Sequence, residues 1–263
     1  MPPRTIEAMD QTLISLAHEL ADAAGQVVRR YFRTPVGVDV KPDQSPVTIA
    51  DRETEAAMRE LIARRRPQDG IYGEEHGQER TDAEFVWVLD PIDGTRAFIT
   101  GMPIFGVLIG LLHRGSPVLG IIDQPILKER WLGVQGQGTS LNGQKLASRA
   151  CPSVDKAFLY STAPDMFQGD DAPPYEKLRK AVRQPRFGGD CYAYGLLALG
   201  LADLVVEAQL QPYDYCAVVP VVEGAGGIMT DWRGKKLGLG SDGRVVAAGD
   251  RACHAQTLAL LGA

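Results

Sequence analysis

The chain has 263 residues, of which 44% are hydrophobic and 23% charged, and its formal net charge is -5. This composition is typical of a globular protein that buries a sizeable core. The acidic balance argues against a surface for nucleic acid or for anionic membranes, because both need a basic excess, so we expect a small molecule as the partner.

Two amphipathic helices are predicted at the start of the chain. Residues 6–32 place leucine, alanine and valine at helical spacing, and arginines gather near the end, where they complement the helix dipole. A short extended piece at 36–41 and a polar turn at 42–46 lead to the second helix at 50–66. The chain therefore opens with a helical layer.

Short apolar and β-branched runs follow, separated by Gly, Pro or Asn, and they indicate a sheet. The predicted strands are residues 85–89, 105–112, 118–123 and 130–134. The glycine-rich stretch 133–143 lacks the Gly-Lys-Ser/Thr ending of a phosphate-binding loop. We interpret it as hairpin turns.

From about residue 151, strands and helices alternate, which is typical of an α/β layer. The predicted elements are residues 157–161, 175–182, 192–201, 203–207, 213–226, 245–248 and 251–261. We predict an N-terminal α+β subdomain, 1–150, and a C-terminal α/β subdomain, 151–263. No flexible linker marks the boundary, so the two are expected to pack tightly and share a site.

Two carboxylates, a glycine and a hydroxyl follow the apolar run at 85–89, in the order Asp90-Pro91-Ile92-Asp93-Gly94-Thr95. Proline and glycine are expected to end the strand, with the acids at its exit and a helical segment at 96–100. Such carboxylates can bind a hard cation, and the backbone N–H groups of Gly94 and Thr95 can bind an anion. A capped Asx-type turn is the alternative.

Two further acidic positions lie at predicted element ends. Glu74 stands between glycines in Gly73-Glu74-Glu75-His76-Gly77, and Asp214 precedes a helix at 218–225. For Asp214 a simple helix N-cap is the alternative. Hard divalent cations need several oxygen ligands, and acids at element ends are a common way to bring them together.

These acidic positions resemble those of the inositol monophosphatase superfamily of metal-dependent phosphatases, over nearly the whole chain. Four motifs carry the resemblance. The first consists of Lys41, Asp43, Thr48 and Asp51. The other three are Gly73-Glu74-Glu75, Asp90-Pro91-Ile92-Asp93-Gly94-Thr95, and Asp214 with Gly224-Ala225-Gly226-Gly227. One departure is Tyr213 before Asp214, where the family commonly has tryptophan. The resemblance implies a layered αβαβα sandwich of the sugar-phosphatase type, assembled as a homodimer.

The resemblance also implies the roles of individual residues. Two or three Mg²⁺ ions would be bound by Glu74, Asp90, Asp93, Asp214 and the Ile92 carbonyl. Asp51 and Thr95 would form a hydrogen-bonded pair, with Glu74 and Thr95 orienting the water that attacks phosphorus directly. The substrate would contact Asp93, Gly94, Thr95, Asp190, Glu207 and Asp214.

The C-terminal half resembles the histidinol-phosphatase branch of this superfamily. The resemblance rests on Gly189-Asp190-Cys191-Tyr192-Ala193-Tyr194, on Val205-Val206-Glu207 and on Arg96 after the threonine. Two carboxylates, Asp190 and Glu207, suit a substrate with an ammonium and an imidazole, since charge-assisted hydrogen bonds are strong. The alternatives are an N-cap for Asp190, a solvated strand end for Glu207, and core packing rather than imidazole stacking for Tyr192 and Tyr194.

The sequence thus predicts a magnesium-dependent phosphomonoesterase that hydrolyses L-histidinol phosphate in histidine biosynthesis. An inositol-1-phosphatase or a broad-specificity phosphatase is the alternative within the class, and a regulatory binding protein is the alternative outside it. The four cysteines form no Cys-x-x-Cys pair, and no targeting signal or membrane anchor is recognisable. We therefore expect a cytoplasmic protein.

Overall fold

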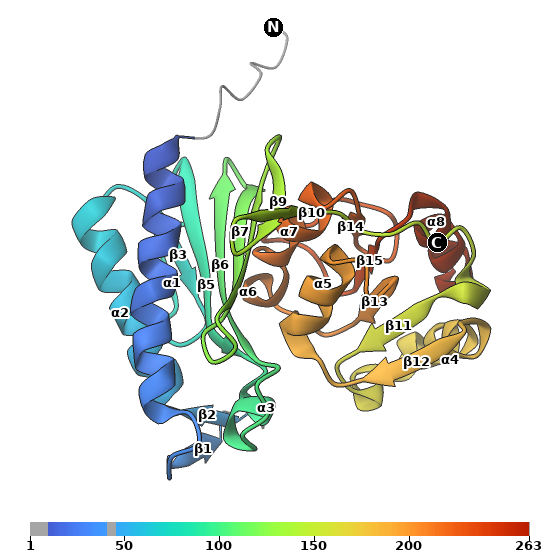
Figure 1. The fold of residues 1–263 in the computed structure, drawn as a ribbon, viewed down its shortest axis with the longest axis horizontal. Helices are drawn as coiled ribbons and strands as arrows, with labels where there is room; N and C mark the ends of the chain where they lie inside the picture. Colours follow the sequence, from blue (N-terminus) through green and yellow to red (C-terminus); the bar gives the residue numbers. More distant parts are fainter. Residues whose placement is uncertain (1–9, 41–45, 263) are drawn as a thin grey trace, which may run out of the picture.

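Helices and sheets alternate in five layers. The computed structural model describes residues 10–40 and 46–262. From one side to the other, the layers are the α1 and α2 pair, an eight-stranded sheet, the helices α5, α6 and α7, a five-stranded sheet, and the α4 and α8 pair (Figure 1). The predicted αβαβα sandwich is confirmed.

The first layer contains the two predicted helices. Helix α1 (Gln11–Tyr31) begins after Asp10, whose carboxylate accepts the Thr12 N–H at 2.9 Å. Residues 6–9 of the predicted helix lie outside the described residues. Strands β1 (Val38–Val40) and β2 (Pro46–Thr48) pair antiparallel, so Pro46 belongs to a strand and not to the predicted turn. Helix α2 (Ile49–Arg65) follows directly.

The eight-stranded sheet has the order β10-β9-β8-β7-β6-β5-β3-β4, and only its β3–β5 pair is parallel within the described residues. Its strands are β3 (Gly70–Gly73), β4 (Gln78–Glu79), β5 (Phe85–Asp93), β6 (Gly106–His113), β7 (Ser116–Gln124), β8 (Glu129–Val134), β9 (Gly138–Leu141) and β10 (Gln144–Leu146). The glycine-rich stretch forms the β8–β9 and β9–β10 hairpins, as predicted.

The end of β5 differs from the prediction. The strand does not stop at Pro91 but continues to Asp93, followed by helix α3 (Thr95–Ile99). Its register against β6 shifts between Asp90, opposite Leu108, and Asp93, opposite Gly106. The extra residue of this bulge takes up the proline, which has no N–H for the ladder. At this bulge, the side chains of Asp90 and Asp93 both approach Asp214.

The five-stranded sheet has the order β12-β11-β13-β15-β14. Its strands are β11 (Phe158–Ser161), β12 (Gln184–Phe187), β13 (Leu204–Glu207), β14 (Ile228–Thr230) and β15 (Val245–Ala248). The helices around it are α4 (Ala172–Ala181), α5 (Asp190–Ala198) and α8 (Arg251–Leu261). The sequence did not predict β12 and β14, which are short and carry no clear alternation.

The predicted helix at 213–226 is two helices, α6 (Pro212–Tyr215) and α7 (Val218–Gly224). Pro220 has no N–H to bond one turn back, so it is tolerated only in the first turn of a new helix. Helix α7 lies directly on the large sheet, where a Cβ at Gly120 or Gly133 would collide with the backbone of Ala217 or Pro220. This close approach places α6, and with it Asp214, beside the end of β5.

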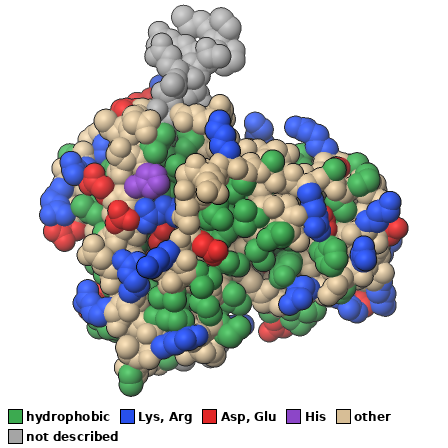
Figure 2. Space-filling view, viewed as in Figure 1, with side chains coloured by type: hydrophobic (Ala, Val, Ile, Leu, Met, Phe, Trp, Pro, Cys, Tyr) green, Lys and Arg blue, Asp and Glu red, His purple; other side chains and the backbone are tan. Residues whose placement is uncertain are grey.

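The first sheet ends at β10 and the second begins at β11, so the predicted boundary near residue 150 lies between the two sheets. The division into subdomains remains a prediction. None of the helices in the described ranges combines the length and apolar character that a membrane-spanning segment requires. On the face seen in Figure 2, charged side chains of both signs are interspersed with exposed apolar ones.

Candidate active site

Three carboxylates from two elements meet between the two sheets. Asp90 and Asp93 come from the bulged end of β5, and Asp214 comes from α6. Each offers one oxygen, and these oxygens lie within 4.8 Å of one another. Residues more than a hundred positions apart in the sequence thus form one cluster that could hold a metal ion.

Backbone N–H groups fix the orientation of all three carboxylates. The donors are Ile92 to Asp90 at 3.0 Å, Cys191 to Asp93 at 2.5 Å and Gln211 to Asp214 at 2.6 Å. The last bond belongs to a capping box in which Gln211 is the N-cap of α6 and Asp214 is its third residue. Asp214 therefore supports its helix as part of that box, and it is not itself the N-cap.

The carboxyl groups of this cluster are harder to ionise than usual. Burial raises the pKa of Asp90 well above its ordinary value, and the charges of Glu74, Asp93 and Asp214 raise it further. Burial likewise raises the pKa of Asp214 to about 7. Buried acids that repel one another are stabilised by a cation between them. Carboxylate oxygens are the ligands that Mg²⁺ prefers, so the donor set fits the predicted metal.

Glu74 stands at the edge of this cluster, directly after β3. Its N–H donates to the Leu89 carbonyl at 3.2 Å, and its side chain acts on the Asp90 carboxyl. Buried Glu55 holds the next two residues of this turn, accepting the N–H groups of Glu75 at 2.6 Å and His76 at 3.1 Å. The sequence did not indicate Glu55, because an acid inside an amphipathic helix reads as a surface residue.

The expected contact between Thr95 and Asp51 is present. The Thr95 hydroxyl lies 3.4 Å from Asp51 Oδ1 and 3.1 Å from the Ile92 carbonyl. Asp51 is buried, and its other oxygen accepts the N–H and hydroxyl of Thr48 at 2.8 and 2.7 Å. Thr48 and Asp51 thereby form the capping box of α2. Of the first motif, Lys41 and Asp43 lie outside the described residues.

A cavity of about 120 Å³ extends from the acidic cluster toward the second sheet. Its lining residues are Asp93, Thr162, Met166, Asp190, Cys191, Tyr194, Glu207, Leu210 and Asp214. Of the residues predicted to bind metal or substrate, four line this cavity: Asp93, Asp190, Glu207 and Asp214. The others, Glu74, Asp90, Ile92, Gly94 and Thr95, are not among its lining residues.

Asp190 is not the N-cap of α5. Gly189 takes that place, and Asp190 is the first helical residue, with a left-handed φ of 45°. Its carboxyl group lies against Gly94, where a Cβ would come within 2.9 Å of it, so glycine is required there for space as well as for its φ of 84°. Burial raises the pKa of Asp190 to about 6, although Arg96 opposes the shift.

Glu207 is not a solvated strand end. The residue is 3% exposed, and its carboxylate oxygens accept the Thr162 N–H at 2.9 Å and the Tyr194 hydroxyl at 2.7 Å. Burial raises its pKa to about 7. Tyr194 is buried and positions this carboxylate, whereas Tyr192 packs edge-on against Trp131 outside the cavity lining.

Sequence reasoning missed several lining residues, among them Thr162, Met166 and Leu210. Strands β11 and β13 run parallel, so the residues at their carboxyl ends, Thr162 and Glu207, come together. The carboxyl ends of parallel strands are a frequent place for binding residues, and this signal could have indicated Thr162. Met166 and Leu210 lie in connections whose sequence carries no such pattern.

Comparisons with known proteins agree with this arrangement. The sequence model of the inositol monophosphatase family matches residues 9–262. The bifunctional phosphatase IMPL2 of Arabidopsis thaliana is 50% identical, over 93% of this chain and 73% of the relative. The histidinol-phosphatase of Chlorobaculum parvum is 36% identical, over 89% and 91%. An inositol monophosphatase structure from Zymomonas mobilis is 49% identical, with a TM-score of 0.90 over 98% and 100%.

Proposed function

The chain belongs to the inositol monophosphatase family and is a phosphatase of that family, and from this premise we propose that it hydrolyses L-histidinol phosphate to L-histidinol and inorganic phosphate. The observation that carries the proposal is the cavity that joins Asp93 and Asp214 to Asp190 and Glu207. A phosphate group at its acidic-cluster end would direct the organic part of the substrate toward the other two carboxylates. The histidinol-phosphatase relative supports the same substrate.

Magnesium is the proposed cofactor, two or three ions per site. Glu74, Asp90, Asp93, Asp214 and the Ile92 carbonyl would hold it. When bound, the ions neutralise phosphate charge and make water a better nucleophile. The Ile92 carbonyl oxygen lies 3.1 Å from the Thr95 hydroxyl, so it connects the proposed metal residues with the residues proposed to orient water.

Glu74 and Thr95 are proposed to orient the attacking water, with Asp51 as the hydrogen-bonded partner of Thr95. Asp51 is held by Thr48 and accepts the Thr95 hydroxyl hydrogen, which leaves the threonine oxygen to accept a hydrogen bond from water. Glu74 is proposed to accept the water proton. The oxygen of that water forms the new bond to phosphorus and keeps its second hydrogen, the ester bond breaks, and the released alkoxide takes up the proton that Glu74 accepted.

The backbone beside Thr95 is proposed to bind the phosphate. Gly94 has a left-handed conformation that only glycine adopts readily, and this conformation sets the direction of the following N–H groups. Backbone N–H groups of Gly94 and Thr95 would donate to phosphate oxygens, as in other anion sites built from successive amides.

Asp190 and Glu207 are proposed to set the preference for histidinol phosphate. This substrate carries an ammonium and an imidazole, and both gain from carboxylate partners more than a neutral polyol does. Inositol phosphate is the second candidate substrate, because the 49% identical structure is that of an inositol monophosphatase.

Phosphate release from the two substrates tests the proposal. We expect faster release from L-histidinol phosphate than from inositol 1-phosphate with magnesium present, and none from either with a chelator. Equal or faster release from inositol 1-phosphate would reject the substrate. Release that persists in the chelator would reject the metal requirement, and no release from either would favour a binding role.

We also propose an oligomeric state and a cellular location for the protein. We infer a homodimer from the family resemblance, which sedimentation equilibrium tests. We infer the cytoplasm as the location, supported by four cysteines that are all buried and free. Fractionation of cells with an antibody against the chain tests the location.

A further inference from the structure

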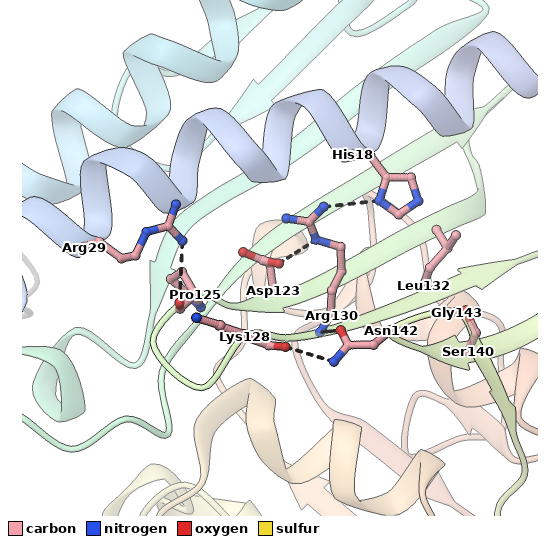
Figure 3. Close-up of a pocket in the computed structure, with 10 residues that line it drawn as sticks. All are labelled: His18, Arg29, Asp123, Pro125, Lys128, Arg130, Leu132, Ser140, Asn142 and Gly143. Atoms are coloured by element: carbon pink, nitrogen blue, oxygen red, sulfur yellow. Dashed lines mark hydrogen bonds and ion pairs between the residues drawn. The ribbon is translucent and has the colours of Figure 1, made fainter.

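A second cavity, of about 350 Å³, lies between α1 and the strand layer beneath it (Figure 3). His18 and Arg29 reach it from α1, and Lys128, Arg130 and Ser140 reach it from the sheet side. Successive residues of a strand face opposite sides of the sheet. Trp131 of β8 packs against Gly195 of α5, so its neighbour Arg130 faces α1. The sheet therefore separates this cavity from the catalytic pocket.

The cavity lining carries more positive than negative charge. Arg29, Lys128 and Arg130 are its cations, and Asp123 is its one carboxylate. Arg130 binds Asp123 at 2.6 Å and reaches Asp22, whose side chain is turned to solvent, at 2.8 Å. The charge of Asp123 is therefore satisfied by Arg130, and Arg29 and Lys128 remain as exposed cations at the cavity.

His18 adds a hydrogen-bond donor of fixed direction. Its Nδ1 lies 3.2 Å from an Arg130 nitrogen, and because a guanidinium only donates, Nδ1 must accept. Burial lowers the pKa of His18, and the charge of Arg130 lowers it further, so the ring stays neutral near pH 7. The hydrogen of the neutral ring is therefore on Nε2, which becomes a donor.

The turn that carries Lys128 is held in place by side chains. Gln124 Oε1 accepts the N–H groups of Ile126 and Leu127, both at 2.7 Å. Asn142 donates to the Lys128 carbonyl at 2.9 Å. Arg29 donates to the Pro125 carbonyl at 3.5 Å, which places its guanidinium over the same turn. The Arg29 guanidinium and the backbone of Lys128 are thus positioned by the folded chain, which lowers part of the entropic cost of binding a ligand.

We propose that this cavity is a second ligand site, specific for a phosphate oxyanion, either inorganic phosphate or the phosphate group of a small molecule. A tetrahedral anion offers oxygens in several directions, and the donors come from two opposite walls. Arg29 and Lys128 supply charge-assisted hydrogen bonds to the anion, whereas His18 Nε2 points away from Arg130 and from these two cations (Figure 3). The cavity volume is within the usual range for small-molecule sites.

Binding of inorganic phosphate to the full chain tests the proposal, measured by equilibrium dialysis with magnesium and then with a chelator. We expect phosphate binding that survives the chelator, because the catalytic pocket without metal is acidic and repels anions. The double variant Arg29→Gln with Lys128→Gln should weaken this binding at least tenfold. It should keep its rate of phosphate ester hydrolysis within twofold.

A matched control is the double variant Arg30→Gln with Lys145→Gln. It removes the same two charges from exposed positions on α1 and β10 outside the cavity lining, and it should leave the binding within twofold. Arg29→Lys keeps the charge and should retain most of the affinity. Absence of chelator-resistant binding would overturn the proposal, and so would equal losses in the two double variants. Neither result bears on the proposed hydrolytic activity.

Discussion

Asp90 and Asp123 lie on the same sheet with almost the same burial, 1% and 4% exposed, yet their surroundings are opposite. Asp123 faces the α1 side and is paired with Arg130 at 2.6 Å. Asp90 faces the second sheet, and the charges that act on it most are those of Glu74, Asp93 and Asp214. Burial raises the pKa of both groups, but Arg130 opposes the shift at Asp123.

The two buried carboxylates differ in what can neutralise their charge. A buried carboxylate with an arginine is neutralised inside the fold and costs little once both are in place. A buried carboxylate among other carboxylates destabilises the folded chain until a cation arrives. The stability of the fold and the affinity for a metal are therefore opposed at Asp90 and Asp93 and unrelated at Asp123.

Asparagine at these positions gives the largest expected effects. Asp93→Asn should lower the rate of phosphate ester hydrolysis about 100-fold or more, because it removes a proposed metal ligand and its charge. Its stability in urea with a chelator should equal or exceed that of the wild type, since repulsion is relieved. Asp123→Asn should keep the rate near that of the wild type but lower the free energy of unfolding by about 2 kcal/mol, because Arg130 loses its buried partner and keeps only the exposed Asp22.

The comparison fails if the two variants lose stability equally in the chelator. A circular dichroism spectrum of Asp93→Asn that matches the wild type provides the control for its fold, because asparagine can still accept the Cys191 N–H.

The stability of the folded chain should also depend on pH through the buried carboxyl groups. Burial raises the folded-state pKa values of Asp214 and Glu207 to about 7, above those of the unfolded chain. The folded chain then binds more protons than the unfolded chain between about pH 4 and 7. The free energy of unfolding, measured in urea with a chelator, should therefore fall as the pH rises through this window.

Magnesium should reverse that trend, since it binds the ionised carboxylates and its affinity rises with pH. At about 100 times its dissociation constant it should add about 2.7 kcal/mol to the free energy of unfolding at pH 8. Stability that is independent of both pH and magnesium would contradict the account of the acidic cluster.

Asp190→Asn should give a smaller, substrate-dependent effect. Asparagine tolerates the left-handed φ of this position, so the change removes the charge with little backbone strain. The KM for L-histidinol phosphate should rise about tenfold, the value of one charge-assisted hydrogen bond, and the KM for inositol 1-phosphate should change less. Steady-state kinetics on both substrates measures this, and parallel changes would mean that Asp190 does not select the substrate.

Tyr194→Phe should give the smallest effect. It removes the hydroxyl that positions Glu207, and we expect a KM for L-histidinol phosphate about fivefold higher with kcat little changed. The matched control is Tyr192→Phe, which removes a similar bond to Glu129 at 2.6 Å outside the cavity lining. Equal effects of the two variants on KM would show that the bond to Glu207 has no special role.

Much of the fold was predictable from local pattern. The helices α1 and α2 and the strands β6, β7 and β8 lie within two residues of their predicted bounds over the described residues, because periodicity in burial is a local signal. Proline misled the prediction in two places. At Pro91 a bulge let the strand continue, and at Pro220 one predicted helix became two.

For the site, too, some features were predictable from local sequence and others were not. The residue types around Asp90 and Asp93 indicated a cation site from local sequence alone, with a capped turn as the alternative. Glu207 was expected at the substrate, but its contacts with Thr162 and Tyr194 could not be inferred, because they depend on the parallel pairing of β11 with β13 and on the packing of α5.

Residue types at short spacing were enough to indicate most of the helices and strands, the acids available for a metal, and the family. Only the tertiary structure decided that Asp214 meets Asp90 and Asp93, that Asp123 is neutralised by Arg130, and that the two cavities lie on opposite faces of one sheet. Which charges become neighbours depends on how layers pack and on where glycines allow close approach. No local pattern along the chain carries that information.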